Sequence, residues 1–176
     1  MIEAVPILPD VDLQPGELYL AREPAILRTI LGSCVGVTFW NARLGAGALC
    51  HGVLPRCPRF LPKGFTLAEG HRFVDFSIRY LAQQFDALGI HRDEIVVKVF
   101  GGADVLPVAR SKSHRPTVGA QNCSVALEVL EEKGFTVSAS DLGGNRGRRI
   151  HFHTGTGEVL LHRLAAWNEA KQRMTP

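Results

Sequence analysis

Residues 35–54 read VGVTFWNARLGAGALCHGVL, two apolar runs separated by a short polar segment. The first run, Val35 to Trp40, is rich in β-branched and aromatic residues, and the second, Gly47 to Leu54, is ended by Pro55. Asn41 to Gly45, between the two runs, has the composition of a turn. This pattern predicts a β-hairpin.

Further strands are predicted on both sides of the hairpin, from short apolar runs bounded by glycine, proline or polar residues. They cover Glu17–Ala21, Ala25–Leu31, Glu94–Phe100, Phe135–Ser140, Arg148–His153 and Gly157–Leu164. Gly32 and Ser33 end one of these strands just before Cys34.

Two helices are predicted between the groups of strands. Thr66 and Glu69 have the spacing of a capping box, and the apolar residues after them recur at helical intervals up to Gly89. These apolar residues are Val74, Ile78, Leu81, Phe85 and Leu88. Asn122–Lys133, followed by Gly134, is predicted as the second helix.

The order of these elements predicts an α/β fold, a single-domain layered sandwich of mixed or antiparallel β-sheet with flanking helices. Residues 1–16, which contain three prolines, are expected to form an extended lead-in. Residues 17–164 are expected to form the domain, and residues 165–176 a C-terminal tail with a frayed helical turn over Trp167–Pro176.

The composition is that of one globular domain. Of its 176 residues 45% are hydrophobic, enough for a core without disulfide or metal staples. The chain carries 20 Lys+Arg against 17 Asp+Glu, a formal net charge of +3. Because nucleic-acid-binding proteins usually concentrate their basic residues in a stripe, this small excess gives no reason to expect a nucleic-acid partner.

The sequence predicts a cytoplasmic protein with no membrane insertion. Glu3 stands where an export signal would carry a basic residue, and Pro6 interrupts the apolar run. No stretch approaches the roughly 18 uncharged apolar residues of a membrane-spanning helix. In a reducing compartment the four cysteines are expected to be free thiols: Cys34, Cys50, Cys57 and Cys123.

No metal site and no cofactor are predicted. Cys50, His51, Cys57 and His71 lie close together in the sequence. Their spacing matches none of the paired arrangements that hold zinc tetrahedrally.

Cys34 and His51 are a candidate catalytic pair. A hairpin that turns symmetrically about Ala42 and Arg43 places Cys34 directly opposite His51. Side chains directly opposite each other have Cβ atoms about 4.5–5.5 Å apart, close enough for a thiol and an imidazole to exchange a proton. A slip of one residue would place Val35 opposite His51 instead, so the pair depends on the register.

Such a pair suits nucleophilic catalysis. A free thiol has a pKa of about 8.5, and a neighbouring imidazole can take its proton to produce the nucleophilic thiolate. Gly32 and Ser33 leave the backbone N–H of Cys34 available as a donor to an oxyanion, and the Thr29 hydroxyl is placed to orient the imidazole. An activated Cys34 is expected to be alkylated faster than the other cysteines at mildly acidic pH.

The residues alone also allow purely structural roles. Free cysteine is among the most buried residue types, so Cys34 also fits a small buried apolar position. His51 also fits a hydrogen-bonded core histidine, and Cys50 and Cys57 offer competing pairs with it.

Five motifs in order resemble the CheD family of chemoreceptor glutamine deamidases. The resemblance covers roughly residues 15 to 164. It is carried by Thr29–Val37, Gly47–Pro55, Lys98–Ala103, Val118–Asn122 and Asp141–Arg148. Gly36 stands where a larger apolar residue is common in the family, and the loop from Pro55 to Thr66 carries Cys57 and additional prolines.

The resemblance implies a three-layer α/β fold and a cysteine-hydrolase mechanism. Cys34 would be the nucleophile, His51 the general base and acid, and Thr29 the residue that supports His51. The substrates would be glutamines of methyl-accepting chemoreceptors, and glutamate methyl esters of the same receptors could be a second substrate. A CheC-type phosphatase is an implied partner.

Arg110, Lys112 and Arg115 are candidate receptor-docking residues. They lie in a segment, Val105 to Leu127, that contains no Asp or Glu. An exposed basic loop of this kind could face the Glu-rich helical surface of a receptor, or be a solvated loop without a specific role.

Two other functions remain open at this level. One is a non-enzymatic adaptor that binds receptors or a CheC-type protein; an intact Cys34, His51 and Thr29 favour an enzyme over it. The other is nucleic-acid binding through the glycine- and arginine-rich run Gly144–Arg149. That run lacks the two flanking helices of a KH loop, so a tight β-turn is the better interpretation.

Overall fold

The computed structural model describes residues 7–105 and 116–165. Its elements, in chain order, are β1 (Asp10–Asp12), β2 (Leu18–Ala21), β3 (Ile26–Leu31), β4 (Val35–Asn41), β5 (Ala46–Gly52), α1 (Leu67–Gly70), α2 (Val74–Ala87), the 3₁₀ turn η1 (Arg92–Glu94), β6 (Val96–Gly101), α3 (Val118–Glu132), β7 (Val137–Leu142), β8 (Arg148–His153) and β9 (Glu158–Arg163).

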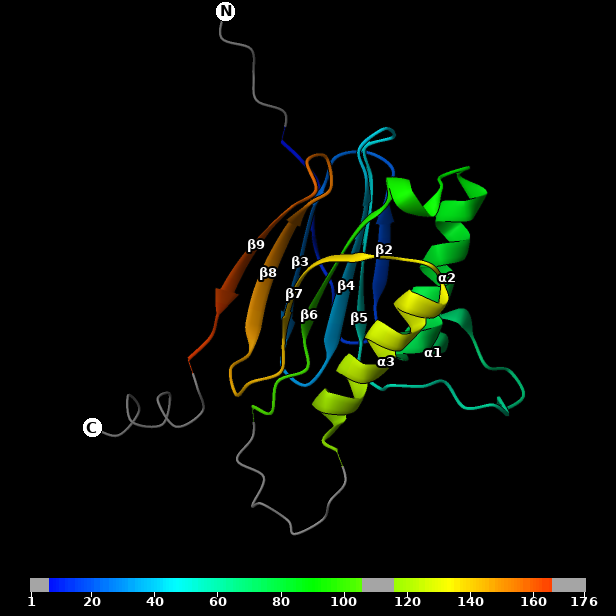
Figure 1. Ribbon diagram of the computed structural model, residues 1–176, viewed down its shortest axis with the longest axis vertical. Coiled ribbons are helices and arrows are strands. Elements are labelled where there is room, and N and C mark those ends of the chain that lie inside the picture. The colour runs from blue at the N-terminus through cyan, green and yellow to red at the C-terminus, as the bar shows by residue number, and fades with distance from the viewer. Residues whose placement is uncertain (1–6, 106–115, 166–176) are drawn as a thin grey trace, which may run out of the picture.

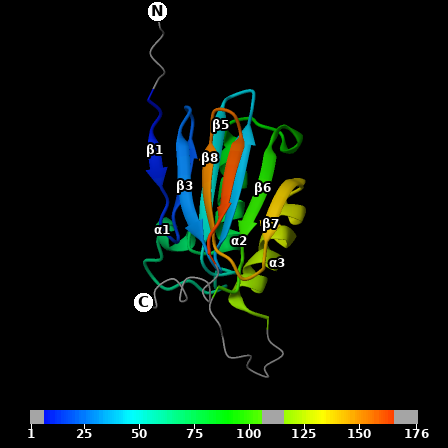
Figure 2. The same cartoon turned by 90° about the vertical axis from the view of Figure 1, so that its left-hand side faces the viewer.

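The elements form three layers (Figure 1). A four-stranded sheet has the order β1-β3-β8-β9, and a five-stranded sheet has the order β2-β5-β4-β6-β7. The pairs β1–β3 and β6–β7 are parallel, and the other neighbours are antiparallel. In Figure 2 the four-stranded sheet faces the viewer, with the five-stranded sheet and the helices behind it. The predicted α/β layered sandwich is confirmed.

Two apolar clusters hold the layers together. The first packs α2 and α3 against the five-stranded sheet, with Phe39 between Phe85 and Phe135 at ring-centroid distances of 5.8 and 5.1 Å. The second lies between the two sheets and includes Leu49 and Phe152. All seven residues of β5 are buried because both faces of its sheet are covered.

β4 and β5 form the predicted hairpin, but in a different register. Gly36 pairs with His51, so the prediction that Cys34 lies directly opposite His51 is wrong by two residues. Because side chains alternate with a period of two, this shift leaves Cys34 and His51 on the same face, as diagonal neighbours.

The turn explains the shift. Asn41 pairs with Ala46, and the Oδ1 atom of Asn41 accepts a hydrogen bond from the backbone N–H of Leu44 at 2.9 Å. This side-chain bond stabilises a four-residue turn, with its centre one residue beyond the predicted one.

The first helical segment is interrupted. Thr66 and Glu69 do form a capping box, but on the four-residue α1, and α2 begins separately at Val74. Between them, Phe73 bridges to Leu54, and the N–H of Val74 donates to the Leu54 carbonyl at 2.8 Å. The expectation of one continuous helix is wrong because this backbone pairs with the segment after β5.

The second helix, α3, is longer than predicted. It begins at Val118, four residues before the predicted start at Asn122. The Thr117 hydroxyl accepts a hydrogen bond from the N–H of Ala120 at 3.2 Å and so caps the helix. The additional turn contains Gly119, which packs against Gly102.

Part of the segment expected as a lead-in belongs to a sheet. Asp10–Asp12 pairs with Ile26–Arg28, and Leu13 is buried.

The predicted turn over Trp167–Pro176 lies outside the described residues. Within the described ranges, no helix is long and apolar enough to cross a membrane.

Candidate active site

His51 lies on the strand next to the edge of the five-stranded sheet, and its backbone is held on both sides. Its N–H donates to the Glu17 carbonyl at 2.9 Å, its carbonyl accepts from the N–H of Gly16 at 2.8 Å, and Gly36 lies opposite it on β4. In β5, Cys50 packs against the helices while Leu49 packs between the sheets. His51, on the same face as Leu49, therefore projects between the two sheets.

Thr29 contacts His51 across the gap between the sheets. The Thr29 Oγ1 lies 2.7 Å from Nδ1 of His51 and donates its own proton to the Leu13 carbonyl at 2.9 Å. A threonine hydroxyl has a single proton, so toward the imidazole it can only accept. Nδ1 of His51 therefore carries hydrogen, and Nε2 carries the free lone pair. The two side chains are in contact, and the role of Thr29 in supporting His51 stays a prediction.

The imidazole is held in its neutral form. Burial lowers the pKa of His51 from 6.5 to about 4, although the Leu13 carbonyl and the Glu17 carboxylate act in the opposite direction. Nε2 is buried and has no hydrogen-bond partner within residues 7–105 and 116–165. A neutral imidazole with an unengaged lone pair is able to act as a base.

Cys34 lies immediately before β4 and packs against the cluster between the two sheets. It is half-buried, and it is two positions from the residue that pairs with His51. Diagonal neighbours of this kind are about 7–8 Å apart at the backbone, within reach of long side chains. The structure thus brings Thr29, Cys34 and His51 to the same inter-sheet layer.

The loop that carries Cys34 is fixed by three successive carbonyl groups. The Gly32 carbonyl accepts from the N–H of Ala103 at 2.8 Å, and the Cys34 carbonyl accepts from the N–H of Gly102 at 2.8 Å. The Ser33 carbonyl accepts from the side-chain amide of Asn122 at 2.9 Å. The candidate oxyanion residues Gly32 and Ser33 are therefore rigidly placed.

This arrangement requires glycine at position 101. Gly101 has a φ of 110°, and a Cβ atom there would lie 2.2 Å from the Cys34 carbonyl oxygen. No other residue permits such close approach of two backbones. The sequence gives no sign of these roles for Gly101, Gly102 and Asn122, because their partners are far away in the chain.

The Cys34 thiol is neutral at rest. Burial raises the pKa of Cys34, and the backbone N–H of Cys34 itself lowers it in part. A raised thiol pKa beside a lowered imidazole pKa disfavours a preformed thiolate–imidazolium pair. This direction opposes the expectation that Cys34 is especially reactive at mildly acidic pH.

The glycine- and arginine-rich run joins β7 to β8. Arg148 is buried, its guanidinium pairs with Asp141 at 2.6 Å, and it donates to the carbonyls of Gly143 and Arg146 at 2.7 and 3.0 Å. The guanidinium of Arg148 therefore holds the turn between β7 and β8. This turn also contacts the end of β6, since the N–H of Gly143 donates to the Gly101 carbonyl.

The other singled-out residues do not join the site. Cys50 faces the helices and His51 faces the other sheet, so these neighbours cannot bind one ion together. Among the described residues, no group of three His, Cys, Asp or Glu side chains has the geometry of a metal site. The candidate docking residues Arg110, Lys112 and Arg115 lie outside the described residues.

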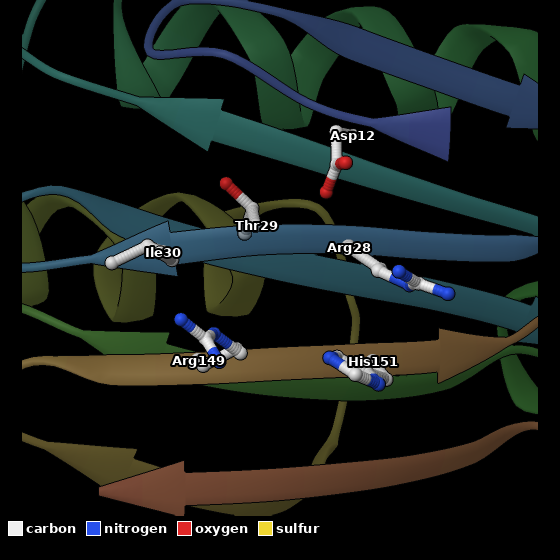
Figure 3. A pocket seen from close by; sticks show the side chains of 6 residues that line it. All are labelled: Asp12, Arg28, Thr29, Ile30, Arg149 and His151. Carbon is white, nitrogen blue, oxygen red and sulfur yellow. The ribbon is translucent and has the colours of Figure 1, made fainter. Parts of the chain in front are cut away.

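A hollow of about 310 Å³ opens on the four-stranded sheet (Figure 3). Its lining includes Thr29 but neither Cys34 nor His51. Basic side chains from β3 and β8 surround it: Arg28, Arg149 and His151. The hollow thus reaches the residue that holds the imidazole, without reaching the thiol.

Comparison with known proteins shows the family of this chain. Residues 60–163 match the family model described as CheD chemotactic sensory transduction. A probable chemoreceptor glutamine deamidase, CheD 2 of Geobacter sulfurreducens, is 43% identical over 90% of this chain and 92% of its own length. Probable CheD deamidases of Maridesulfovibrio salexigens and Pseudomonas savastanoi are 36% and 34% identical, over 88% and 93% of this chain and 91% and 92% of their own. The chain belongs to the CheD family.

Proposed function

We propose that this protein is a chemoreceptor glutamine deamidase that works through Cys34 and His51. The observation that carries the proposal is the Thr29–His51 contact of 2.7 Å, which leaves Nε2 of a neutral imidazole free on the layer that also holds Cys34. The names of the relatives supply the substrate class, side-chain amides of receptor glutamines.

The first half of the reaction forms a thioester. As Sγ of Cys34 attacks the carboxamide carbon, Nε2 of His51 takes the thiol proton. The carbonyl oxygen becomes an oxyanion beside the N–H of Cys34, a group close enough to Sγ to lower the thiol pKa. When the C–N bond breaks, the imidazolium returns its proton to the departing nitrogen, which leaves as ammonia.

The second half restores the enzyme. Nε2 of His51 takes a proton from water, the hydroxide attacks the thioester carbon, and the thiol leaves with the proton that the imidazole returns. The product is glutamate. A glutamate methyl ester enters the same sequence with methanol as leaving group, so we include receptor demethylation in the proposal.

The proposal also includes a docking segment and a partner protein. Arg110, Lys112 and Arg115 are assigned to docking on acidic receptor helices, and a CheC-type phosphatase is a candidate partner. The four cysteines are free thiols in the structure, which is consistent with a cytoplasmic protein.

Ammonia release from receptor fragments tests the function. Incubation with receptor cytoplasmic domains is expected to release one ammonia, and to add about one mass unit, for each glutamine converted. Fragments with Gln→Glu at the converted positions should release none. Receptor binding without ammonia release would favour the adaptor role. If the protein neither binds the fragments nor releases ammonia, the proposal is contradicted.

Thr29→Val tests the support of the imidazole. Valine keeps the shape of threonine but cannot accept the Nδ1 proton, so the imidazole is free to rotate or to place hydrogen on Nε2. We expect kcat to fall about 10–100-fold with little change in KM. Thr29→Ser, which keeps the hydroxyl, should stay within about threefold of the parent. Activity lost in Thr29→Ser but kept in Thr29→Val would mean that the methyl group matters and the hydroxyl does not.

A further inference from the structure

Asn122 is a fully buried polar residue that the proposed mechanism does not use. It lies in the second turn of α3, with a side chain 0% exposed. A buried amide is costly unless its polar atoms are paired, so its hydrogen bonds show what holds it there.

The side-chain amide of Asn122 joins the two segments that carry the thiol and the imidazole. Its Nδ2 donates to the Ser33 carbonyl at 2.9 Å and to the Val53 carbonyl at 3.0 Å. Ser33 directly precedes Cys34, and Val53 follows His51 by two residues. Both amide protons are therefore used between these segments.

The position of this bridge matters because backbone pairing ends just before it. The last pair of the β4–β5 ladder is Val35 with Gly52, and Ser33 and Val53 both lie beyond that pair. At this end, the Asn122 amide supplies the hydrogen bonds that join the two segments where the ladder no longer does.

The amide must point in one direction. Oδ1 of Asn122 is buried and has no hydrogen-bond partner within the described part of the chain. A flipped amide, or a carboxylate, would place an oxygen against two carbonyl oxygens. The bridge therefore requires an NH₂ group.

We propose that Asn122 is a positioning residue for the deamidation reaction, setting the separation of the Cys34 thiol from the His51 imidazole by bridging Ser33 and Val53. The inference rests on the proposed function. It adds a residue from α3 to a site otherwise built from strands and one loop. Small errors in placing reacting groups are costly, because proton transfer and attack both need near-contact geometry.

Asn41 offers a matched control at the other end of the hairpin. It is 1% exposed, and its Nδ2 donates to the Glu94 carbonyl at 3.0 Å. Asn41→Ala and Asn122→Ala each remove a buried amide that donates to backbone, so both should destabilise the fold. Asn41 also accepts a hydrogen bond from Leu44, but in the turn at the far end of the hairpin, whereas Asn122 bonds residues next to Cys34 and His51.

The test measures unfolding, kcat and KM of both alanine variants, together with the rate at which iodoacetamide alkylates Cys34. We expect Asn122→Ala to lower kcat about 10–100-fold with KM within about twofold, and Asn41→Ala to leave kcat within about twofold. If Asn122→Ala does not fold, Asn122→Ser, which keeps one donor, takes its place.

A double-mutant comparison separates positioning from general loosening. Asn122→Ala should slow Cys34 alkylation in the parent but change it less than about twofold in a His51→Gln background, because the base it positions is already gone. Equal slowing in both backgrounds, or a kcat loss matching that of Asn41→Ala, would overturn the inference. If His51→Gln itself changes neither alkylation nor deamidation, the proposed function fails instead.

Discussion

Cys34→Ala is expected to lower receptor deamidation at least about a thousandfold, to the background rate. Without the thiol no thioester can form, and the remaining groups have no nucleophile to activate. Cys34 lies in a loop whose carbonyls are bound through the backbone, so alanine should leave the fold intact. Ammonia release and the unfolding temperature, measured on the same preparation, check both statements.

Two further variants sharpen this result. Cys34→Ser should be as inactive as the alanine variant, because the imidazole of His51 is too weak a base to activate a hydroxyl here. Cys57→Ala, which changes a partly exposed cysteine on the loop after β5, should keep full activity. Substantial deamidation by either Cys34 variant would mean that another group carries the reaction.

Because burial raises the Cys34 pKa, alkylation of the parent at mildly acidic pH should not favour Cys34.

His51→Gln is expected to lower kcat about 10²–10⁴-fold and to change the form of the pH profile. A base must be unprotonated, and burial lowers the His51 pKa to about 4. Parent kcat/KM should therefore fall as the pH drops through about 4, and stay level from about pH 5 to pH 8. In the variant the plateau should disappear, because only the small thiolate fraction reacts and that fraction grows with pH.

The measurement is the rate profile of both proteins from about pH 3 to about pH 8, with folding followed at each pH. His71→Gln is a matched control: burial also lowers the His71 pKa, but that residue lies between α1 and α2, outside the site. A His51→Gln variant that kept the level plateau would show that a different base removes the thiol proton.

Local patterns predicted much of the fold. β8 matches its predicted bounds, and the hairpin forms as expected because strand composition and turn chemistry are short-range properties. The break before α2 was missed because the backbone of Phe73 and Val74 pairs with Leu54, a contact that helical periodicity does not report. β1 was missed because three residues with alternating acids gain strand structure only from β3 beside them.

The candidate site shows the same division. Cys34, His51 and Thr29 were predicted, and the error of two residues in register left the thiol and imidazole on one face because the side-chain period is two. The hydroxyl-to-imidazole contact lies between residues of different sheets and follows only from the way the sheets pack. Asn122 was predicted as the start of a helix and not as part of the site, since its acceptors lie 89 and 69 residues away.

The division of the proposed site between two sheets should make the proposed catalysis sensitive to how they pack. Thr29 belongs to the four-stranded sheet and His51 to the five-stranded sheet, and their side chains meet at 2.7 Å. Sliding of one sheet over the other by an ångström would break this contact while every ladder within the sheets survived. On warming or in denaturant, enzyme turnover should therefore disappear before circular dichroism records any loss of strands. Activity would then report how the two sheets are aligned, whereas the spectrum reports only that the strands are present.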